Sequence, residues 1–408
     1  MVKTAVIVCI AVLGSLFAWK GVIPGWREVS TDFANYYVSS RALLAGENLD
    51  SLYNSDWFKA KGRQYEAPQA QKFDPFPPIT AFAALPFAWL EIQTAQRLSV
   101  ILDVILLCCC VPLVRRISGW GWLPSILFLL APGIGLSNNV RLGQIYIAIL
   151  FLTLLGYILI GKKDQLSGIS YALIFVIKYF SLIYLPGFWL ARRKQLTFAF
   201  IVFAAGLVMF QFIYFGPAVM SEYFLSSLLP HMDGRLSGQG IHNYSFQSWE
   251  SFLSFLFVED PHYNPQPFLA TPWAKTPVKY FIFLALLGGM MFAIRKALRL
   301  AEDQRLNACL GILGISGFAL LPVSATYHFV MLAFPVLLIC NLSNIDNRYR
   351  WAILFLYAGI GLIPYKFFAQ LAGDWGVFFG FPRLWAVSIL FVITLLAVAG
   401  VEHKTSQS

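Results

Sequence analysis

Charged residues are scarce in this chain of 408 residues. Asp, Glu, Lys and Arg together account for 12% of the sequence, whereas 58% of it is hydrophobic. A water-soluble protein of this length cannot bury so much apolar surface, so part of its surface must face lipid. The apolar runs also lack the alternation of transmembrane β-strands, which excludes a β-barrel. The sequence therefore predicts an all-α, polytopic integral membrane protein.

Signatures of several other functions are missing as well. The chain has no GxSxG nucleophile elbow, no Walker phosphate loop and no HExxH zinc motif. Its six cysteines show no CxxC or Cys/His spacing, and Cys108–Cys110 lie inside an apolar run. We therefore expect no metal site and no cofactor. Asp103 is the only acid deep in a predicted span, which is unlike a proton- or sodium-coupled transporter.

The net charge of +10 is explained by membrane topology. No basic run is interleaved with aromatic residues, so we expect no nucleic-acid partner. The basic residues gather beside helix ends, where they orient the protein and meet anionic lipid. By the positive-inside rule, the basic segments at 115–116, 162–163, 192–194, 295–299 and 348–350 should face the cytoplasm, as should both termini.

The apolar segments predict about 12 transmembrane helices within a single domain, 1–408. A spanning helix needs about 20 apolar residues. Segment 166–191 predicts a hairpin of two short helices with Lys178 at its outer tip, and the proline-rich segment 76–90 predicts a re-entrant piece. The other expected spans are 4–19, 95–114, 122–137, 144–160, 196–217, 277–294, 306–323, 328–341, 350–365 and 382–400.

With this topology, the polar features gather on the outer face. The first outer loop (20–75) and the long outer loop (217–275) lie there, with the turn NNVRLGQ (138–144). Residues 33–46, FANYYVSSRALLAG, predict an amphipathic helix lying in the membrane interface and ending at Gly46. We therefore expect the working surface to be the outer face.

Two acids are candidates for a catalytic base. Asp32, in DFANYY, lies just past the first span, where a carboxylate could take a proton from a hydroxyl group. The structural alternative is a helix N-cap, which Ser30, Thr31 or Asp32 could provide. Asp74, in KFDPFPP, is the second candidate base.

Two cations are candidates for binding an anionic lipid headgroup. Arg141 and Lys178 lie at or within the membrane boundary, where a charge is costly without a partner. Together they could hold a phosphate. The alternative is internal ion pairing with Asp32, Glu47 or Asp74.

Two further segments have both structural and functional interpretations. His328 lies at the mouth of a predicted span, where it could contact a ligand or serve as a hydrogen-bonded structural residue. The segment HNYSFQSWESFL (242–253), which includes Asn243, predicts an aromatic amphipathic helix. This helix could cover a groove or rest on the membrane.

The order of these motifs adds a resemblance that covers nearly the whole chain. DFxxYYxxSRALLxGxxLxxLY, FxPFPPI, NNxRLGQ, IKYF, HNYS and TYHFVMLAFP together resemble glycosyltransferase family 87 of the GT-C superfamily. The resemblance implies a GT-C-like bundle with outer-face interfacial helices. It also implies transfer of a hexose, by default mannose, from a polyprenyl-phosphate donor to a glycolipid or lipid-linked glycan acceptor. The reaction would invert configuration at the periplasmic or extracellular face of the cytoplasmic membrane.

The resemblance further implies roles for individual residues. Asp32 would be the general base, and Lys178, Arg141 and His328 would hold the donor phosphate, without a metal. The expected sugar or acceptor contacts are Arg41, Tyr36, Gln144, Asn243 and Asp74.

Two other classes of protein remain as alternatives. A flippase or transporter of lipid-linked sugars would use the same cations but would not need Asp32 as a base. A lipid-linked glycan polymerase or ligase would favour a longer outer loop rich in arginine, whereas Arg235 is the only arginine in 217–275.

Overall fold

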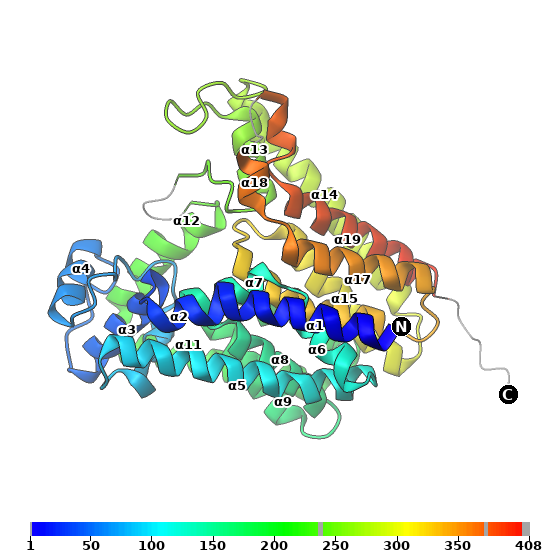
Figure 1. Ribbon diagram of the computed structural model, residues 1–408, viewed down its shortest axis with the longest axis horizontal. Coiled ribbons are helices and arrows are strands. Elements are labelled where there is room, and N and C mark those ends of the chain that lie inside the picture. Colours follow the sequence, from blue (N-terminus) through cyan, green and yellow to red (C-terminus); the bar gives the residue numbers. More distant parts are fainter. Residues whose placement is uncertain (1, 236–239, 371–373, 402–408) are drawn as a thin grey trace.

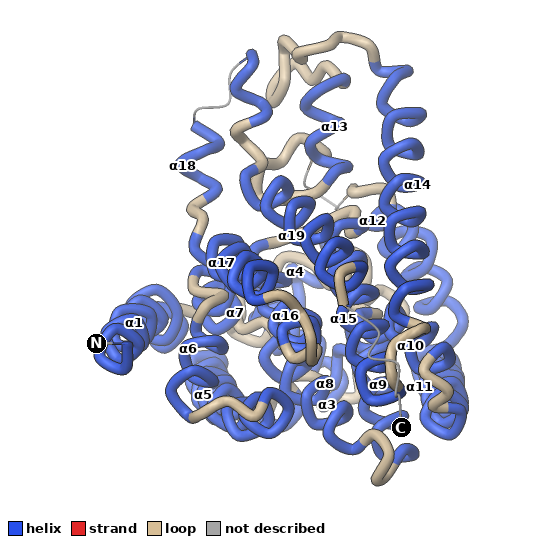
Figure 2. Tube along the Cα trace, turned by 90° about the vertical axis from the view of Figure 1, so that its right-hand side faces the viewer, coloured by secondary structure: helices blue, strands red, loops and turns tan. Residues whose placement is uncertain are grey.

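The computed structural model describes residues 2–235, 240–370 and 374–401 (Figure 1). Helices and the loops between them make up this part of the chain, and no β-strand occurs in it (Figure 2). The prediction of an all-α protein is confirmed.

Five helical segments in the described residues are long and apolar enough to cross a membrane. They are Lys3–Arg27, which joins α1 (Val2–Phe17), η1 (Ala18–Val22) and α2 (Ile23–Arg27); α5 (Ile92–Ser118); Lys194–Met232, which joins α11 (Lys194–Glu222), η5 (Tyr223–Leu228) and α12 (Leu229–Met232); α14 (Pro272–Ala297); and α19 (Pro382–Ala399).

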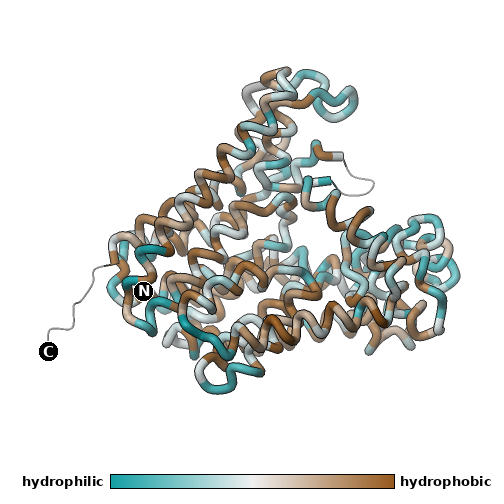
Figure 3. Tube along the Cα trace, turned by 180° about the vertical axis from the view of Figure 1, so that it is seen from behind, coloured by the Kyte–Doolittle hydropathy of each residue, from teal (hydrophilic) through white to brown (hydrophobic). Residues whose placement is uncertain are grey.

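The two ends of the molecule are polar and its middle is apolar. In Figure 1, α1 begins and α19 ends at the same end, and α3 (Thr31–Leu44) and α4 (Ser55–Gln64) lie at the opposite end. Figure 3 shows an apolar band between these two ends, both of which carry hydrophilic segments. This distribution is that of a membrane protein.

The expected number of about 12 spans is not confirmed. The structure has five candidates, or six if a bent pair of helices counts as one span. The expected span 122–137 is that pair: α6 (Trp122–Leu130) and α7 (Ile134–Leu142) meet at an angle of 69°. Pro132 and Gly133 lie at the break, and both disfavour a continuous helix. Other apolar helices are short: α8 (Tyr146–Leu159) has 14 residues, so it is about 21 Å long.

The structure has the expected hairpin in one of the two irregular segments that the sequence singles out, and no helix of spanning length in the other. Segment 166–191 is a hairpin of α9 (Asp164–Lys178), η4 (Phe180–Tyr184) and α10 (Leu185–Leu190), with Lys178 at the turn. Segment 76–90 contains only the short helices η2 (Pro78–Phe82) and η3 (Leu85–Phe87), which do not reach spanning length.

The helix expected at 33–46 is α3, but other elements of the protein cover it. Most residues of α3 are buried, because η2, η3, α4 and α5 pack around it. Tyr36 and Tyr37 are among these buried residues. The Tyr37 hydroxyl donates to the Leu90 carbonyl at 2.6 Å, and the Tyr53 hydroxyl donates to the Phe76 carbonyl at 2.7 Å.

Segment 217–275, which was expected to be a long loop, is partly helical. Past a non-helical residue, Gly216, the helix of α11 continues through η5 and α12 to Met232, and α13 (Trp249–Phe257) follows. Aromatic residues of α13 and of the start of α19 form a separate cluster that includes Phe252, Phe255 and Phe381.

The main core lies where the other helices surround α16 (Ala333–Cys340), every residue of which is buried. Figure 2 shows α16 near the middle of the bundle and α1 at its edge. The remaining elements are α15 (Glu302–Leu320), η6 (Thr326–Leu332), α17 (Asn347–Leu362), α18 (Tyr365–Gln370) and η7 (Asp374–Phe378).

Candidate active site

A cavity of about 780 Å³ opens at the end of the molecule that carries α3 and α12. Residues of α3, α7, α8, α9, η5, α12 and η6 contribute to its wall, so the cavity joins segments that are far apart in the sequence. Its acids, lysines and histidines are Asp32, Asp74, Lys72, Lys178, His231 and His328.

Asp32 lines the cavity from the first turn of α3. The N-cap of this helix is Ser30, whose Oγ accepts a hydrogen bond from the Phe33 backbone N–H at 3.2 Å. Asp32 is therefore not the cap, which was its structural alternative. Its Oδ2 instead accepts a hydrogen bond from Gln144 Nε2 at 2.8 Å.

The surroundings of Asp32 favour its protonated form. Burial raises the pKa of the Asp32 carboxyl above its ordinary value, because the anion loses water. The hydrogen bond from Gln144 and the positive charges of Lys178 and Lys72 lower the pKa, but they do not offset the effect of burial. A carboxylate with a raised pKa is a stronger base, which suits proton transfer from a hydroxyl group.

Gly143 allows Gln144 to reach Asp32. It ends α7 with φ = 64°, and a Cβ atom at this position would lie 2.6 Å from the Cβ of Phe33. A larger residue would thus both strain the backbone and push α7 away from α3. The carbonyl of Gln144 is held in turn by Asn139 Nδ2 at 2.9 Å.

Lys178 lines the same cavity from the turn of the α9 hairpin. Its Nζ lies 4.4 Å from the ring centroid of Phe76 and 5.6 Å from that of Tyr146. Such ring faces attract a cation but do not neutralise it. Among the residues that the structure describes, Lys178 forms no hydrogen bond and no ion pair. Its positive charge is available to an anionic ligand.

Internal ion pairing, the alternative for the candidate cations, is not found for Lys178 or Arg141 in the described parts of the chain. Glu47 is bound by Lys61 instead, with the two charged atoms 2.6 Å apart. Asp74 lines the cavity and has Lys72 Nζ at 3.7 Å.

His328 is part of the cavity wall and also has a structural contact. Its Nδ1 accepts a hydrogen bond from the Ala325 backbone N–H at 3.2 Å. Its ring packs against Tyr146, Phe180 and Tyr327. Both interpretations of His328 are therefore compatible with its position.

The structure does not bring the two expected arginines into the cavity. Arg141 is exposed at the end of α7 and does not line the cavity wall. Arg41 donates a hydrogen bond to the Ala88 carbonyl at 2.8 Å and lies over the ring of Tyr65, at 5.5 Å from its centroid. Arg41 thus links α3 to Ala88 and Tyr65, which lie in two other parts of the chain.

Tyr36 and Asn243 lie behind the wall. The Tyr36 hydroxyl donates to Gln144 Oε1 at 3.4 Å, so it supports the residue that binds Asp32. Asn243 Oδ1 accepts a hydrogen bond from the Ser245 backbone N–H at 2.9 Å, and Ser245 rather than Asn243 lines the cavity.

Asn35, Lys72 and His231 are among the polar residues of the wall that were not predicted. Asn35 lies three positions after Asp32, and this spacing places both on one face of α3, so helical periodicity could have identified it. Lys72 could have been found beside Asp74 in the motif KFDPFPP. The sequence did not indicate that His231 would line a cavity, because the helix that carries it extends into a segment expected to be a loop.

The described residues contain no group of three or more His, Cys, Asp or Glu side chains that could hold a metal ion. The cavity therefore offers a carboxylate that can accept a proton and a lysine that can bind an anion. A base that takes the proton of the attacking hydroxyl and a cation that stabilises the leaving anion are the two groups needed to transfer a chemical group from an anionic leaving group to a hydroxyl group.

The family model described as glycosyltransferase family 87 matches residues 75–322. This range is more than half of the chain and includes Lys178, whereas Asp32 and His328 lie outside it. No curated protein matches the chain.

Proposed function

The chain belongs to glycosyltransferase family 87, and on this basis we propose that it transfers a hexose from a polyprenyl-phosphate donor to a glycolipid or glycan acceptor. The family makes the protein a membrane glycosyltransferase. Mannose is the proposed sugar. The observation that carries the proposal is the placing of Asp32 and Lys178 on the wall of one cavity without an ion pair between them.

The proposed reaction is a single in-line displacement. Asp32 accepts the proton of an acceptor hydroxyl, whose oxygen attacks the anomeric carbon of the sugar. The bond from that carbon to the phosphate oxygen breaks, and polyprenyl phosphate leaves with the electron pair. The configuration at the anomeric carbon is inverted. Lys178 stabilises the charge that develops on the leaving phosphate.

The walls of the cavity support an amphiphilic donor. Apolar side chains line the side between η4 and α12, among them Leu182, Phe224 and Met232, and these three are also exposed at the surface of the molecule. A polyprenyl chain could lie across them while its phosphate enters the cavity.

The positions of the basic loops support a site on the outer face. The cavity lies at the end of the molecule opposite to the start of α1. Lys3 and the basic end of α5, at 115–116, are expected in the cytoplasm. We therefore propose that transfer occurs at the periplasmic side of the cytoplasmic membrane.

The test measures label transfer by purified protein in nanodiscs, using radiolabelled polyprenyl-phosphate-mannose and a membrane glycolipid extract. Asp32→Asn should reduce transfer by about 10²–10⁴-fold, the usual contribution of a general base. Asp56→Asn is the matched control, because Asp56 is an exposed acid on α4, which lies at the same end of the molecule as α3.

The possible outcomes separate the alternatives. Transfer that survives Asp32→Asn would move the base to Asp74 or elsewhere. Absence of transfer from every lipid-phosphate sugar, together with uptake or flipping of the labelled lipid, would favour the flippase.

A further inference from the structure

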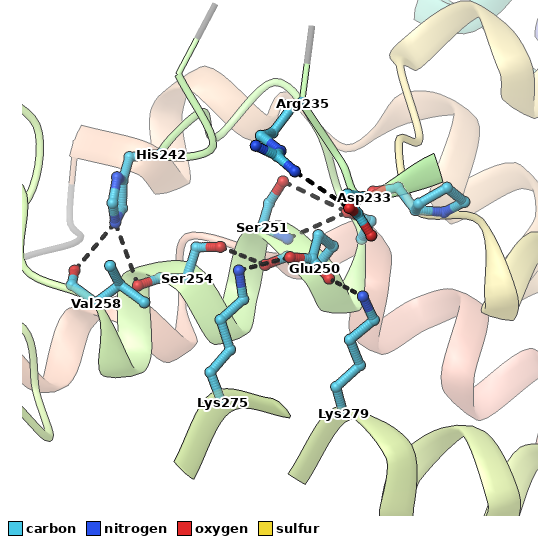
Figure 4. Close-up of polar contacts among 11 residues, drawn as sticks. Asp233, Arg235, His242, Glu250, Ser251, Ser254, Val258, Lys275 and Lys279 are labelled. Carbon is cyan, nitrogen blue, oxygen red and sulfur yellow. Dashed lines mark hydrogen bonds and ion pairs between the residues drawn. The ribbon is translucent and has the colours of Figure 1, made fainter. Parts of the chain in front are cut away.

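A second cluster of charged side chains lies where α13 meets α14 (Figure 4). Glu250 of α13 is only 4% exposed, and its carboxylate binds Lys275 Nζ at 2.5 Å and Lys279 Nζ at 2.8 Å. The two lysines are one helical turn apart on α14. One carboxylate thus holds two ammonium groups, which leaves a net positive charge.

These residues line a pocket of about 400 Å³. Arg235 and Asp233 pair with each other at its rim, with Nη2 and Oδ2 3.2 Å apart. At Gly234, which has φ = 74°, a Cβ atom would lie 2.4 Å from Cγ of Glu250. The backbone at this glycine therefore lies directly against the buried carboxylate.

The pocket adjoins the catalytic cavity at the end of α12. Met232 lines the catalytic cavity, and the next residue, Asp233, lines the pocket. Tyr280, also in the pocket wall, is exposed on α14, as are Phe281 and Leu284. Since α14 is a candidate membrane span, this exposed apolar face is expected to meet lipid.

The charges favour an anion in the pocket. Three cations, Arg235, Lys275 and Lys279, face two acids, Asp233 and Glu250, so one positive charge is in excess. The lysine side chains are only 16% and 19% exposed, so their charges are weakly screened by water. An ammonium group has three donor hydrogens, and Glu250 does not use all of them.

We infer that this pocket binds the phosphate or carboxylate headgroup of a membrane-anchored glycolipid acceptor, whose lipid chains lie along the exposed face of α14. The inference rests on the proposed function, because it names the class of acceptor that the transferase would use. Glu250 fixes the two lysines before the ligand arrives, so little side-chain entropy is lost on binding.

The test is a crosslinking experiment that needs neither donor nor turnover. Tyr280 is replaced by p-benzoylphenylalanine, and the purified full-length protein is irradiated with dihexanoyl phosphatidic acid. Adducts are counted by intact-protein mass spectrometry. Dihexanoyl phosphatidylcholine is the zwitterionic control, and inorganic phosphate is added as a competitor. We expect an adduct with phosphatidic acid and little with phosphatidylcholine.

Variants of the cluster decide whether its charges bind the ligand. Glu250→Gln should increase the adduct, because both lysines lose their internal anion. The triple variant Glu250→Gln/Lys275→Gln/Lys279→Gln leaves no unpaired charge in the cluster and should reduce the adduct about tenfold. If Glu250→Gln does not fold, the triple variant decides. Lys178→Gln should leave the adduct unchanged, since it lies in the other cavity.

Several results would overturn the inference. They are an adduct that persists in the triple variant, equal labelling by phosphatidylcholine, or a decrease in folded Glu250→Gln, which would indicate a purely structural cluster. Inorganic phosphate that competes as well as the lipid would identify a site for a free anion. Asp32→Asn should give the same adduct, so loss of transfer without loss of labelling would count against the proposed function alone.

Discussion

Two cavities of this protein contain the same kinds of charged groups but arrange them differently. At the catalytic cavity, Asp32 and Lys178 come from α3 and α9 and form no ion pair with each other. At the pocket beside α14, Glu250 holds Lys275 and Lys279 within 2.8 Å. Charges that are kept apart remain fully available to a substrate, whereas the paired charges also hold α13 and α14 together.

Keeping charged groups apart costs free energy, and this cost explains where each arrangement occurs. A partly buried charge without a partner is unfavourable, and natural proteins keep such charges mainly at functional sites. The scaffold holds Asp32 and Lys178 on separate helices, because α3 packs mainly on η2 and α9 packs mainly on α11. The first cavity therefore gives the predictions about transfer, and the ion pairs of the second pocket also give predictions about stability.

After the loss expected for Asp32→Asn, the largest effect is expected on transfer by the Lys178→Gln variant. Removing the cation that faces the leaving phosphate should reduce label transfer by about 10²–10³-fold, as does loss of one group that stabilises developing charge. The unfolding temperature should not fall, because Lys178 has no bonded partner in the described residues. Lys61→Gln is the control, since Lys61 pairs with Glu47 away from the cavity.

The comparison would fail if Lys178→Gln destabilised the protein while transfer per folded molecule stayed constant. Lys178 would then be a residue that stabilises the fold and not one that acts on the substrate.

The second prediction concerns stability and separates the two acids. Glu250→Gln leaves two lysines without their carboxylate and should lower the free energy of unfolding by about 1–3 kcal/mol. Asp32→Asn should be neutral or stabilising at pH 7, because burial raises the pKa of Asp32 in the folded state. Denaturant unfolding in detergent measures both variants.

The sign of the Asp32 effect depends on pH. A raised pKa means that the folded state binds the proton more tightly than the unfolded state does, so the ionised carboxylate destabilises the fold. The gain from Asp32→Asn is therefore expected above the folded-state pKa, and it should vanish as the pH falls below the ordinary value for Asp. A loss of stability at pH 7 would contradict this picture.

The third prediction concerns Gln144. In the described residues, Asp32 accepts a hydrogen bond from this neutral amide, whereas the partners of Glu250 are two lysines. Gln144 Nε2 donates to Asp32 and lowers its pKa. Gln144→Met removes this donor at similar volume, so the acid limb of the pH–rate profile should move to higher pH. The limb should disappear in Asp32→Asn. An unchanged profile in Gln144→Met would mean that Asp32 is not the group that titrates.

The sequence was a good guide to where the chain turns and a poor guide to which way its side chains face. The break in apolarity at Lys178 predicted a turn at the outer side, and the structure places the lysine at the turn of the α9 hairpin. By contrast, the alternation of apolar and polar residues in 33–46 predicted a helix resting on lipid. It could not show that η2 and α4 would cover the exposed face of α3.

Residues around the α6–α7 break show the same limit. The motif NNVRLGQ (138–144) contains both Gln144, which reaches Asp32, and Arg141, which does not line the cavity. Their side chains point differently because α7 ends at Gly143 and the chain changes direction there. Nothing in a single sequence gives the angle at which a helix turns its face towards a partner.

Arg141 therefore gives the last and smallest prediction. A phosphate in the cavity would meet Lys178 and Lys72, both of which line its wall, whereas Arg141 is exposed outside it. Since exposed charges are screened by water and salt, Arg141→Gln should change transfer by less than about twofold. Lys72→Gln, the matched change inside the wall, should raise the KM for the donor more. If Arg141→Gln instead raised the KM as strongly as Lys178→Gln does, α7 would have to rotate when the donor binds, and its bend at Gly133 would be the point of movement.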